Sequence, residues 1–239
     1  MPTYNEADNI SDILEHVLGH GVFDILVVDD NSSDGTREII REKMQNHGNV
    51  QMLERPGKMG LGTAYTTGFK WGLEHGYDCM MEMDSDFSHD PDVMPKFLEA
   101  VKDGAHLVIG SRYIGGTISV IGWDFKRLLL SRFGNIYASH ILGLPLTDMT
   151  SGFRAYTRRA LNGIDLEAIY SEGYSFQIEM AYYVWCQGLE VREIPIIFTE
   201  RARGSSKMSK KIVREAVKLP WKLRVRRMLG RINCTPAPE

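Results

Sequence analysis

Acidic residues crowd the stretch E-M-D-S-D-F-S-H-D-P at residues 82–91. Asp84 and Asp86 stand two apart there, directly behind the apolar run C-M-M-E-M. In an extended D-x-D sequence alternate side chains project to one side, so these two carboxylates would converge. A divalent cation stabilises converging anions, and oxygen ligands favour Mg²⁺ or Mn²⁺. The alternative is an acidic loop that caps a helix starting near Pro91.

A second pair of carboxylates, Asp29 and Asp30, ends the apolar run F-D-I-L-V-V-D-D. In open parallel sheets, ligands bind outside the carboxyl ends of the strands. Acids therefore stand at that end of two predicted strands. The pattern predicts a site at this edge, with an ion whose open positions accept phosphate oxygens.

A phosphate receptor is predicted farther along the chain. If residues 123–142 form a helix, Arg127, Ser131 and Asn135 recur every four residues and share one face. An arginine and a hydroxyl on one face bind phosphate, and Arg112 at a strand end would complete the receptor. The alternative is a solvated polar stripe on the helix surface.

The elements that must position these residues alternate between short strands and helices, which predicts an α/β domain with a mostly parallel sheet. Strands are expected in residues 23–30, 50–54, 78–84, 105–112 and 191–198. Helices are expected in residues 9–18, 35–46, 61–75, 91–102, 123–142 and 175–187. The basic C-terminal segment should be a helix broken near Pro220, followed by a disordered T-P-A-P-E tail.

The loop M-P-T-Y-N-E begins at residue 1. In a nucleotide-binding α/β unit such a loop normally follows a first, central strand. That strand is missing from the predicted elements. We expect either that the true start lies farther upstream or that something else fills the slot.

Length and composition are those of a globular protein with one substantial core: 239 residues, 43% hydrophobic and 25% charged. Three widely spaced cysteines predict neither a metal cluster nor a disulfide framework, which suggests a reducing compartment. The sequence has no signal peptide and no run of 18 apolar residues, so no membrane span is predicted.

The net charge of −3 conceals a strong asymmetry. Residues 201–231 hold twelve Lys or Arg against Glu215 alone, so this basic arm carries +11 and the remainder −14. Its interleaved apolar and basic residues are typical of an interfacial helix on an anionic bilayer. Docking onto an integral membrane partner and a merely solvated helix are the alternatives. Nucleic acid is disfavoured because the body is acidic and has no base-reading motif.

Nine motifs in order carry a family resemblance. P-T-Y-N-E, V-V-D-D-N-S-S-D-G-T, R-P-G-K-M-G-L-G-T-A, M-D-S-D-F-S-H-D-P and G-S-R-Y resemble the GT-A family 2 glycosyltransferases, which use nucleoside-diphosphate sugars. The segments G-W-D-F-K-R-L-L-L-S-R-F-G-N, D-M-T-S-G-F-R-A-Y, G-Y-S-F-Q-I-E-M and E-R-A-R-G-S-S-K-M narrow the match. Together they look like the polyprenol-phosphate mannosyltransferases, the dolichol-phosphate mannose synthase family, over residues 2–210.

The resemblance implies a nucleotide-sugar site. Residues implied to line the nucleotide pocket or the turn beside it are Pro2, Tyr4, Glu6, Val28, Asp30, Lys58, Gly60, Leu61 and Gly62. Residues implied to hold the ribose, the metal and the diphosphate are Asp84, Ser85 and Asp86, with Ser88 as a further metal ligand. Ser88 is shorter than the glutamine of some relatives. Arg201 and Lys207 would neutralise the diphosphate.

The acceptor and the catalytic groups follow in the same way. The resemblance assigns Arg112, Arg127 and Ser131 to the phosphate of the lipid acceptor, in agreement with their spacing. The implied catalytic set is Asp84, Asp86, Arg112, Arg127, Ser131 and Arg201.

The resemblance implies transfer of mannose, with inversion, from GDP-mannose to a polyprenyl or dolichyl monophosphate. The enzyme would need Mg²⁺ or Mn²⁺ and would sit peripherally on the cytoplasmic side of a membrane. A phosphate monoester has a second pKa near 6, so this nucleophile needs no strong general base. Catalysis would consist of alignment and of stabilising the leaving diphosphate.

Two other functions fit parts of the sequence. A family 2 enzyme that moves glucose or an aminosugar from a UDP donor, or that uses a soluble acceptor, would carry almost the same donor motifs. V-V-D-D also suits a phosphoacceptor signalling domain, but such domains are much shorter and lack R-x-x-G-x-S-K.

The expected layout is a catalytic domain at 1–200 with a nucleotide and metal half (1–111) and an acceptor half (112–200). The basic arm (201–231) and a disordered tail (232–239) would follow.

Overall fold

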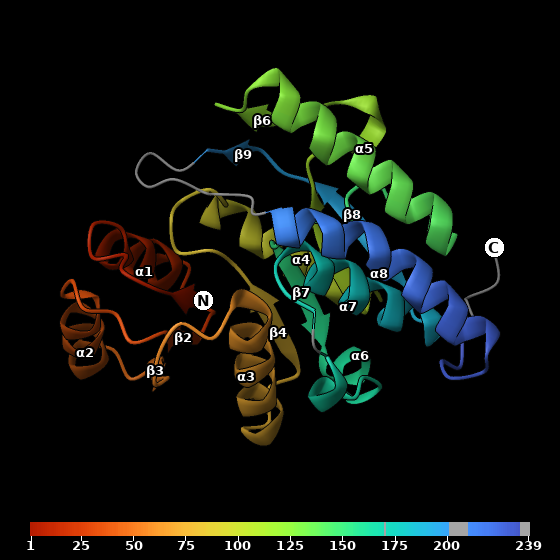
Figure 1. Cartoon of the computed structure of the whole chain (residues 1–239). Coiled ribbons are helices and arrows are strands. Elements are labelled where there is room, and N and C mark those ends of the chain that lie inside the picture. The colour runs from red at the N-terminus through yellow and green to blue at the C-terminus, as the bar shows by residue number, and fades with distance from the viewer. Residues whose placement is uncertain (170, 201–209, 235–239) are drawn as a thin grey trace.

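A computed structural model describes residues 1–169, 171–200 and 210–234 of the chain. Short strands occupy the middle of the molecule and helices surround them (Figure 1). The strands are β1 Pro2–Thr3, β2 Ile25–Asp29, β3 Val50–Glu54, β4 Cys79–Glu82, β5 Leu107–Ser111, β6 Val120–Ile121, β7 Arg154–Thr157, β8 Val191–Pro195 and β9 Phe198–Thr199. The helices are α1 Ile10–Gly19, α2 Thr36–Asn46, α3 Leu61–Glu74, α4 Met94–Lys102, α5 Phe125–Leu142, α6 Arg158–Asn162, α7 Tyr174–Cys186 and α8 Lys210–Met228.

The strands form two main sheets. β1, β2 and β3 are parallel, with Pro2 opposite Val28 and Ile25 opposite Val50. The second sheet has the order β4-β7-β5-β8, in which β8 is parallel to β5 and β7 is antiparallel to both neighbours. The predicted α/β class with mostly parallel pairing is confirmed. β7 was not predicted, because its residues R-A-Y-T show no polar and apolar alternation.

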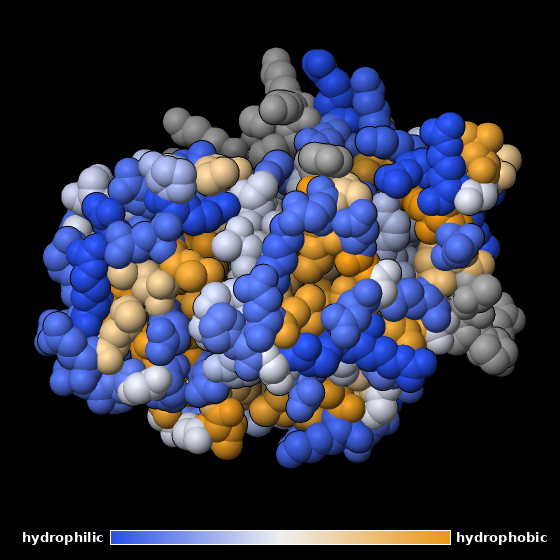
Figure 2. Space-filling view, turned by 90° about the horizontal axis from the view of Figure 1, so that it is seen from below, coloured by the Kyte–Doolittle hydropathy of each residue, from blue (hydrophilic) through white to orange (hydrophobic). Residues whose placement is uncertain are grey.

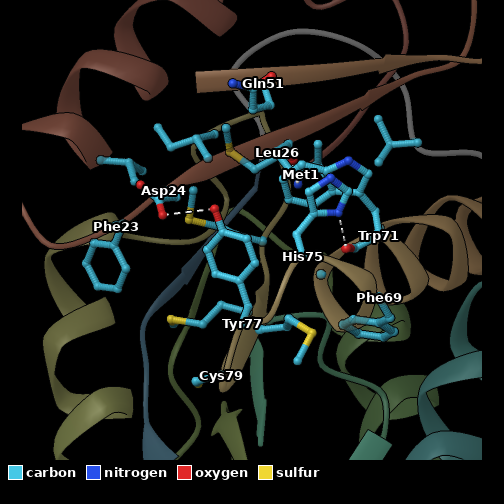
Figure 3. A pocket seen from close by; sticks show the side chains of 18 of the residues that line it. Met1, Phe23, Asp24, Leu26, Gln51, Phe69, Trp71, His75, Tyr77 and Cys79 are labelled. Carbon is cyan, nitrogen blue, oxygen red and sulfur yellow. Dashed lines mark hydrogen bonds between the residues drawn. The ribbon is translucent and has the colours of Figure 1, made fainter. Parts of the chain in front are cut away.

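A cavity of about 720 Å³ separates the two sheets (Figure 3). Residues of β2 line one side and residues of β4 line the other. Within the described residues, β1 supplies only Pro2 and Thr3 at this position. Alongside the rest of β2, no described strand pairs on this side, and the cavity occupies that space.

Two apolar clusters hold the helices to the sheets. One joins α1 and α4 to β2, through residues such as Ile13, Val27 and Phe97. The other joins α3 and α7 to the second sheet and includes Leu219 and Leu223 of α8. The basic arm is thus anchored in the core where the structure describes it. α8 continues through Pro220, so the predicted break is wrong. Burial of Leu219 and Leu223 offsets the loss of the hydrogen bond that proline cannot make.

Cys186, the last residue of α7, forms a disulfide with Cys234, 48 residues later. The prediction that the cysteines form no disulfide is wrong, because α8 packs along α7 and returns the chain to this point. The cysteines therefore no longer indicate a reducing compartment. The predicted disorder is also wrong for residues 232–234, since Ile232 is buried. Residues 235–239 lie outside the described part.

The surface carries apolar side chains among hydrophilic ones. Figure 2 views the underside, where hydrophobic side chains emerge between hydrophilic neighbours. Among the described residues, no helix has both the length and the apolar character to cross a bilayer.

Candidate active site

The carboxylate loop, residues 84–90, follows β4. The strand ends at Glu82, and Phe87 has a φ of 59°. Asp84 therefore lies beyond the strand and Asp86 lies in a bend, not in the extended D-x-D chain that we predicted. Asp84 accepts a hydrogen bond from the Tyr65 hydroxyl (3.2 Å), and Asp86 accepts one from the Ser88 amide (3.0 Å). Their carboxylates are positioned by these bonds and not by strand geometry.

Ser88 and His89 complete this loop. The Ser88 hydroxyl is buried and has no hydrogen-bond partner within the described structure. A buried oxygen without a partner costs free energy, so this atom and the adjacent Asp86 form a donor set that fits a hard divalent cation. His89 accepts from the Asp84 amide through Nδ1 (3.2 Å) and stacks on Phe153. Burial lowers the pKa of His89, which favours the neutral ring that this contact needs.

Arg55 organises residues that the sequence predicts to line a nucleotide pocket. Its Nε donates to Asp30 (2.5 Å), Nη1 donates to Thr63 (2.8 Å), and Nη2 donates to the Gly60 carbonyl (3.0 Å). Asp30 also accepts from the Met59 amide (3.3 Å). Arg55 therefore ties the turn at 58–63 to the end of β2. We did not predict this role, although an arginine directly behind the strand V-Q-M-L-E was a usable signal.

The turn itself contacts Glu172. Gly60 has a φ of 103°, and a Cβ there would lie 2.4 Å from the Glu172 carboxylate, so only glycine suits the position. The Gly62 amide, at the start of α3, donates to Glu172 (3.1 Å). Burial raises the pKa of this half-buried carboxyl. Leu61 is partly exposed beside it. Nothing in the sequence around Glu172 indicated this contact.

The remaining predicted nucleotide residues lie around the same strand ends. Lys58 places its ammonium 4.5 Å from the centre of the Tyr4 ring. Ser85 donates to the Pro2 carbonyl (3.2 Å) and so joins the carboxylate loop to β1. Glu6 accepts from Asn9 (2.9 Å) at the start of α1. Pro2 also borders the cavity between the sheets, as does Val28.

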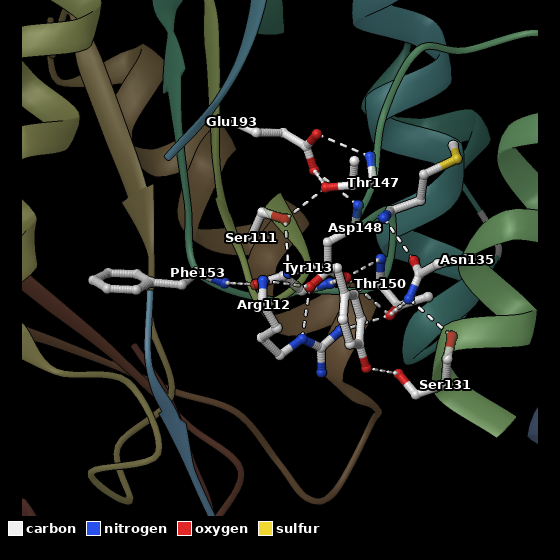
Figure 4. A network of polar contacts seen from close by, with 12 residues as sticks. Ser111, Arg112, Tyr113, Ser131, Asn135, Thr147, Asp148, Thr150, Phe153 and Glu193 are labelled. Carbon is white, nitrogen blue, oxygen red and sulfur yellow. Dashed lines mark hydrogen bonds and ion pairs between the residues drawn. The ribbon is translucent and has the colours of Figure 1, made fainter. Parts of the chain in front are cut away.

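Arg112 and Asp148 form a buried bidentate ion pair (Figure 4). The Nε–Oδ2 and Nη2–Oδ1 distances are 2.6 and 2.7 Å, and the Arg112 amide also donates to Asp148 (3.0 Å). Burial opposes the charge of Arg112, but the carboxylate outweighs burial and raises the pKa of the guanidinium. The same pairing lowers the pKa of Asp148 against the effect of its burial. None of these contacts uses Nη1.

α5 turns its predicted polar face toward this pair. Asn135 is fully buried and bonds both Thr150 (3.1 Å) and the Met149 amide (2.7 Å). Ser131 accepts from the Tyr113 hydroxyl (2.8 Å). A solvated polar stripe is therefore excluded for Asn135.

Arg127, one turn earlier, lies 4.3 Å from the centre of the Trp123 ring. It donates to Glu200 from Nη1 (2.5 Å), a pairing that we did not predict. Arg127 and Ser131 line a cavity of about 240 Å³. Its other walls are mostly apolar, with contributions from Trp123, Leu130, Phe133, Tyr137, Ile178 and Val217. A cation and a hydroxyl thus border a mostly apolar space.

β9 brings the two halves of the site together. The Thr199 amide donates to the Ser88 carbonyl (3.2 Å) in the carboxylate loop. The Phe198 ring lies 5.5 Å from the His89 ring and 5.4 Å from the Trp123 ring, measured between centroids. The carboxylate loop and the predicted acceptor residues are thus connected through β9.

Two charged residues of the family motifs, Arg154 and Glu179, are buried. Arg154 is fully buried and donates to the carbonyls of Met149, Ser151 and Gln177, so it supports the D-M-T-S loop and does not pair with Asp148. Glu179 is buried and accepts from Ser171 and Tyr183. Arg201 and Lys207 lie outside the described residues.

The chain is similar to known glycosyltransferases. It is 45% identical over 221 residues to the polyprenol monophosphomannose synthase of Mycolicibacterium smegmatis, covering 91% of this chain and 82% of that one. It is 46% identical over 219 residues to the undecaprenyl-phosphate mannosyltransferase of Micrococcus luteus, covering 91% and 89%.

Solved structures share the fold at low identity. Glucosyl-3-phosphoglycerate synthase from Mycobacterium tuberculosis with Mn²⁺, UDP-glucose and phosphoglyceric acid has a TM-score of 0.66 at 17% identity, covering 94% and 78% of the two chains. The same enzyme with Mg²⁺ and UDP has a TM-score of 0.65 at 18% identity, covering 100% and 78%. Residues 1–164 match the model of the glycosyl transferase family 2. The chain therefore belongs to glycosyl transferase family 2.

Proposed function

We propose that this enzyme transfers mannose from GDP-mannose to a polyprenyl phosphate, with inversion at the anomeric carbon. The observation that carries the proposal is the 240 Å³ cavity, in which Arg127 and Ser131 border apolar walls. A phosphate joined to an isoprenoid chain matches this combination. The names of the two relatives, both at about 45% identity over most of the chain, support the same acceptor class and the same sugar.

On the donor side, Asp84 and Asp86 would hold Mg²⁺ or Mn²⁺, with the buried Ser88 hydroxyl as a further ligand. The metal would stabilise the charge that develops on the departing nucleoside diphosphate. Tyr65 orients Asp84 through its hydroxyl, and the Ser88 amide orients Asp86. Arg55 fixes Asp30 and the turn at 58–63, which would border the nucleoside.

On the acceptor side, the phosphate would bind between Arg127, Ser131 and the Nη1 atom of Arg112. The buried Asp148 fixes the orientation of Arg112 through two hydrogen bonds. The phosphate is already ionised at neutral pH, so these residues need only align its oxygen with the anomeric carbon. Arg127 would exchange Glu200 for the phosphate as the acceptor binds.

Membrane attachment would come from α5 and α8, which lie side by side (Figure 1). Tyr137 links them: its hydroxyl donates to the Val217 carbonyl and accepts from Trp221, both at 2.9 Å. Exposed apolar side chains recur every three or four residues along both helices: Phe125, Leu129, Phe133 and Ile136 on α5, and Val217, Trp221, Val225 and Met228 on α8. Exposed Lys218, Lys222 and Arg224 accompany them. Such a surface fits peripheral binding to the anionic cytoplasmic face of a bilayer.

The test is a donor panel. Purified protein receives polyprenyl phosphate, Mg²⁺ or Mn²⁺, and radiolabelled GDP-mannose, UDP-glucose or UDP-N-acetylglucosamine, and the lipid fraction is resolved by thin-layer chromatography. We expect label in the lipid with GDP-mannose. Labelled lipid from a UDP-sugar alone would show that the enzyme transfers another sugar in place of mannose. Labelled lipid in no combination would overturn the proposal.

A further inference from the structure

Two histidines and an aspartate meet near the surface, outside the candidate active site. His16 lies in the last turn of α1, and His20 caps that helix four residues later. The His20 backbone keeps a helical conformation (φ −74°, ψ −19°), so both rings leave the same side of the helix. The rings stack, with 6.2 Å between their centroids. Asp92 belongs to a short 3₁₀ turn, Pro91–Val93, that directly follows the carboxylate loop.

Asp92 brings one carboxylate oxygen close to both rings. Its Oδ1 atom lies 3.0 Å from His16 Nε2 and 3.4 Å from His20 Nε2. Ligand atoms of the three residues all lie within 4.8 Å of one another. Around a tetrahedral ion with bonds of about 2.0–2.1 Å, neighbouring ligand atoms stand about 3.3 Å apart. Both histidine–aspartate distances are close to this spacing, so rotation of the side chains alone would bring the three atoms around one ion.

Hydrogen bonding accounts for only part of this arrangement. His16 Nε2 and Asp92 Oδ1 form a hydrogen bond of 3.0 Å. His20 Nε2 is shielded from solvent and has no hydrogen-bond partner among the described residues, although Asp92 stands nearby. A buried nitrogen without a partner costs free energy. A cation bound between the rings would give both nitrogens and the carboxylate a common partner.

The cluster is connected to the carboxylate loop in two ways. The Asp92 amide donates to Asp90 Oδ1 (2.9 Å), and Asp90 is the last residue of that loop. The ring of Phe87, also in the loop, lies 6.4 Å from the His16 ring, measured between centroids. Phe87 has a φ of 59°, which residues other than glycine rarely adopt. An ion bound by the cluster would therefore join the end of α1 to the loop at both of these points.

The types of ligand decide which ion suits the cluster. Imidazole nitrogens favour zinc and other late first-row metal ions, whereas Mg²⁺ and Mn²⁺ favour sites built from oxygen ligands. Two histidines at positions i and i+4 of a helix are a recurring zinc-binding arrangement. Zinc sites made of two histidines and a carboxylate keep the fourth position for water.

We propose that His16, His20 and Asp92 bind a Zn²⁺ ion, which fastens the end of α1 to the carboxylate loop. This site is separate from the oxygen ligands that we assign to Mg²⁺ or Mn²⁺, because it uses other side chains and prefers a different class of ion. Zinc would replace the hydrogen bond between His16 and Asp92 and would give His20 Nε2 a partner.

The test is a calorimetric titration of the untagged protein with Zn²⁺ in excess Mg²⁺. We expect one Zn²⁺ to bind per chain. His16→Gln and His20→Gln should each weaken binding at least about tenfold, and the double variant should not bind zinc at this site. His140→Gln, which removes another exposed histidine near the end of a helix, is the matched control and should leave the affinity unchanged. Circular dichroism confirms that each variant is folded.

Bound zinc should also restrain the segments that it joins. Amide hydrogen exchange at residues 87–93 should slow by roughly tenfold or more when zinc is added to the original chain or to His140→Gln, and should not change in the double variant. Zinc uptake that leaves this exchange unchanged would contradict the fastening of α1 to the loop.

Undiminished zinc binding by the double histidine variant would overturn the proposal. Zinc binding that is lost from Asp86→Ala but kept by the double variant would also overturn it, because the ion would then lie in the carboxylate loop. Absence of zinc binding by the original chain would have the same meaning. No readout uses a sugar donor or acceptor, so failure of mannosyl transfer would leave this result intact.

Discussion

Arg127 is held by Glu200, with 2.5 Å between Nη1 and Oε1. The guanidinium that we assign to the acceptor phosphate thus has a carboxylate partner, 73 residues farther along the chain, that lies directly after β9. A bound phosphate and Glu200 would compete for the same cation.

Glu200→Gln should therefore strengthen acceptor binding. Removing a partly exposed ion-pair partner changes the binding free energy by at most about 1 kcal/mol, so KM for polyprenyl phosphate should fall by up to about fivefold. Initial rates against acceptor concentration measure this effect. Glu38→Gln on α2, which removes one of the two carboxylate partners of Arg41, is the control. An unchanged or higher acceptor KM would show that Glu200 does not compete.

Arg127→Ala should mainly impair the use of the acceptor. We expect KM for polyprenyl phosphate to rise at least about tenfold while KM for GDP-mannose stays near its original value, because charge-assisted hydrogen bonds are worth about 1.5–3 kcal/mol. Arg127→Lys should recover part of the loss, since it restores the charge without the planar fork. Equal changes in both KM values would remove Arg127 from the acceptor site.

Asp148→Asn should destabilise the fold. Arg112 is 3% exposed, and breaking a buried ion pair typically costs about 3–5 kcal/mol. Urea unfolding of both proteins measures the difference in free energy. Asp78→Asn, which removes a fully exposed partner of Arg158, is the control and should leave stability nearly unchanged. Similar unfolding midpoints for Asp148→Asn and the original chain would contradict the buried pair.

The buried Met1 amino group should make stability depend on pH. Burial lowers its pKa from 8.0 to about 6, so the unfolded chain holds the extra proton between these values and stability rises across that window. Acetylation of Met1 removes the charge. The acetylated chain should be more stable below pH 6, by up to about 3 kcal/mol, and the difference should vanish above pH 8. A difference that does not change with pH would contradict burial of the charged amine.

Local sequence features predicted the elements better than the contacts between them. The apolar runs before Asp30 and Asp84 located the carboxyl ends of β2 and β4 to within two residues, and four-residue spacing put Ser131 and Asn135 on one face of α5. The partners of Asp30 and Arg127 lie 25 and 73 residues away, and no periodicity connects such pairs.

Two other features of the fold were not predicted from the sequence, for related reasons. β7 is buried between two strands, so its sequence lacks the alternation that reveals an exposed strand. The cysteines at 186 and 234 meet only because α8 packs on α7, which depends on tertiary contacts and not on cysteine spacing.

The most direct test of the central claim is transfer of labelled mannose from GDP-mannose to polyprenyl phosphate by the original chain and by Asp86→Ala, assayed side by side with Mn²⁺ and with excess chelator. Circular dichroism confirms that both proteins are folded. We predict labelled lipid from the original chain with Mn²⁺, and almost none with chelator or from Asp86→Ala. Near-normal transfer by Asp86→Ala, or transfer that is indifferent to chelator, would contradict the role of the carboxylate loop in holding the metal and the diphosphate.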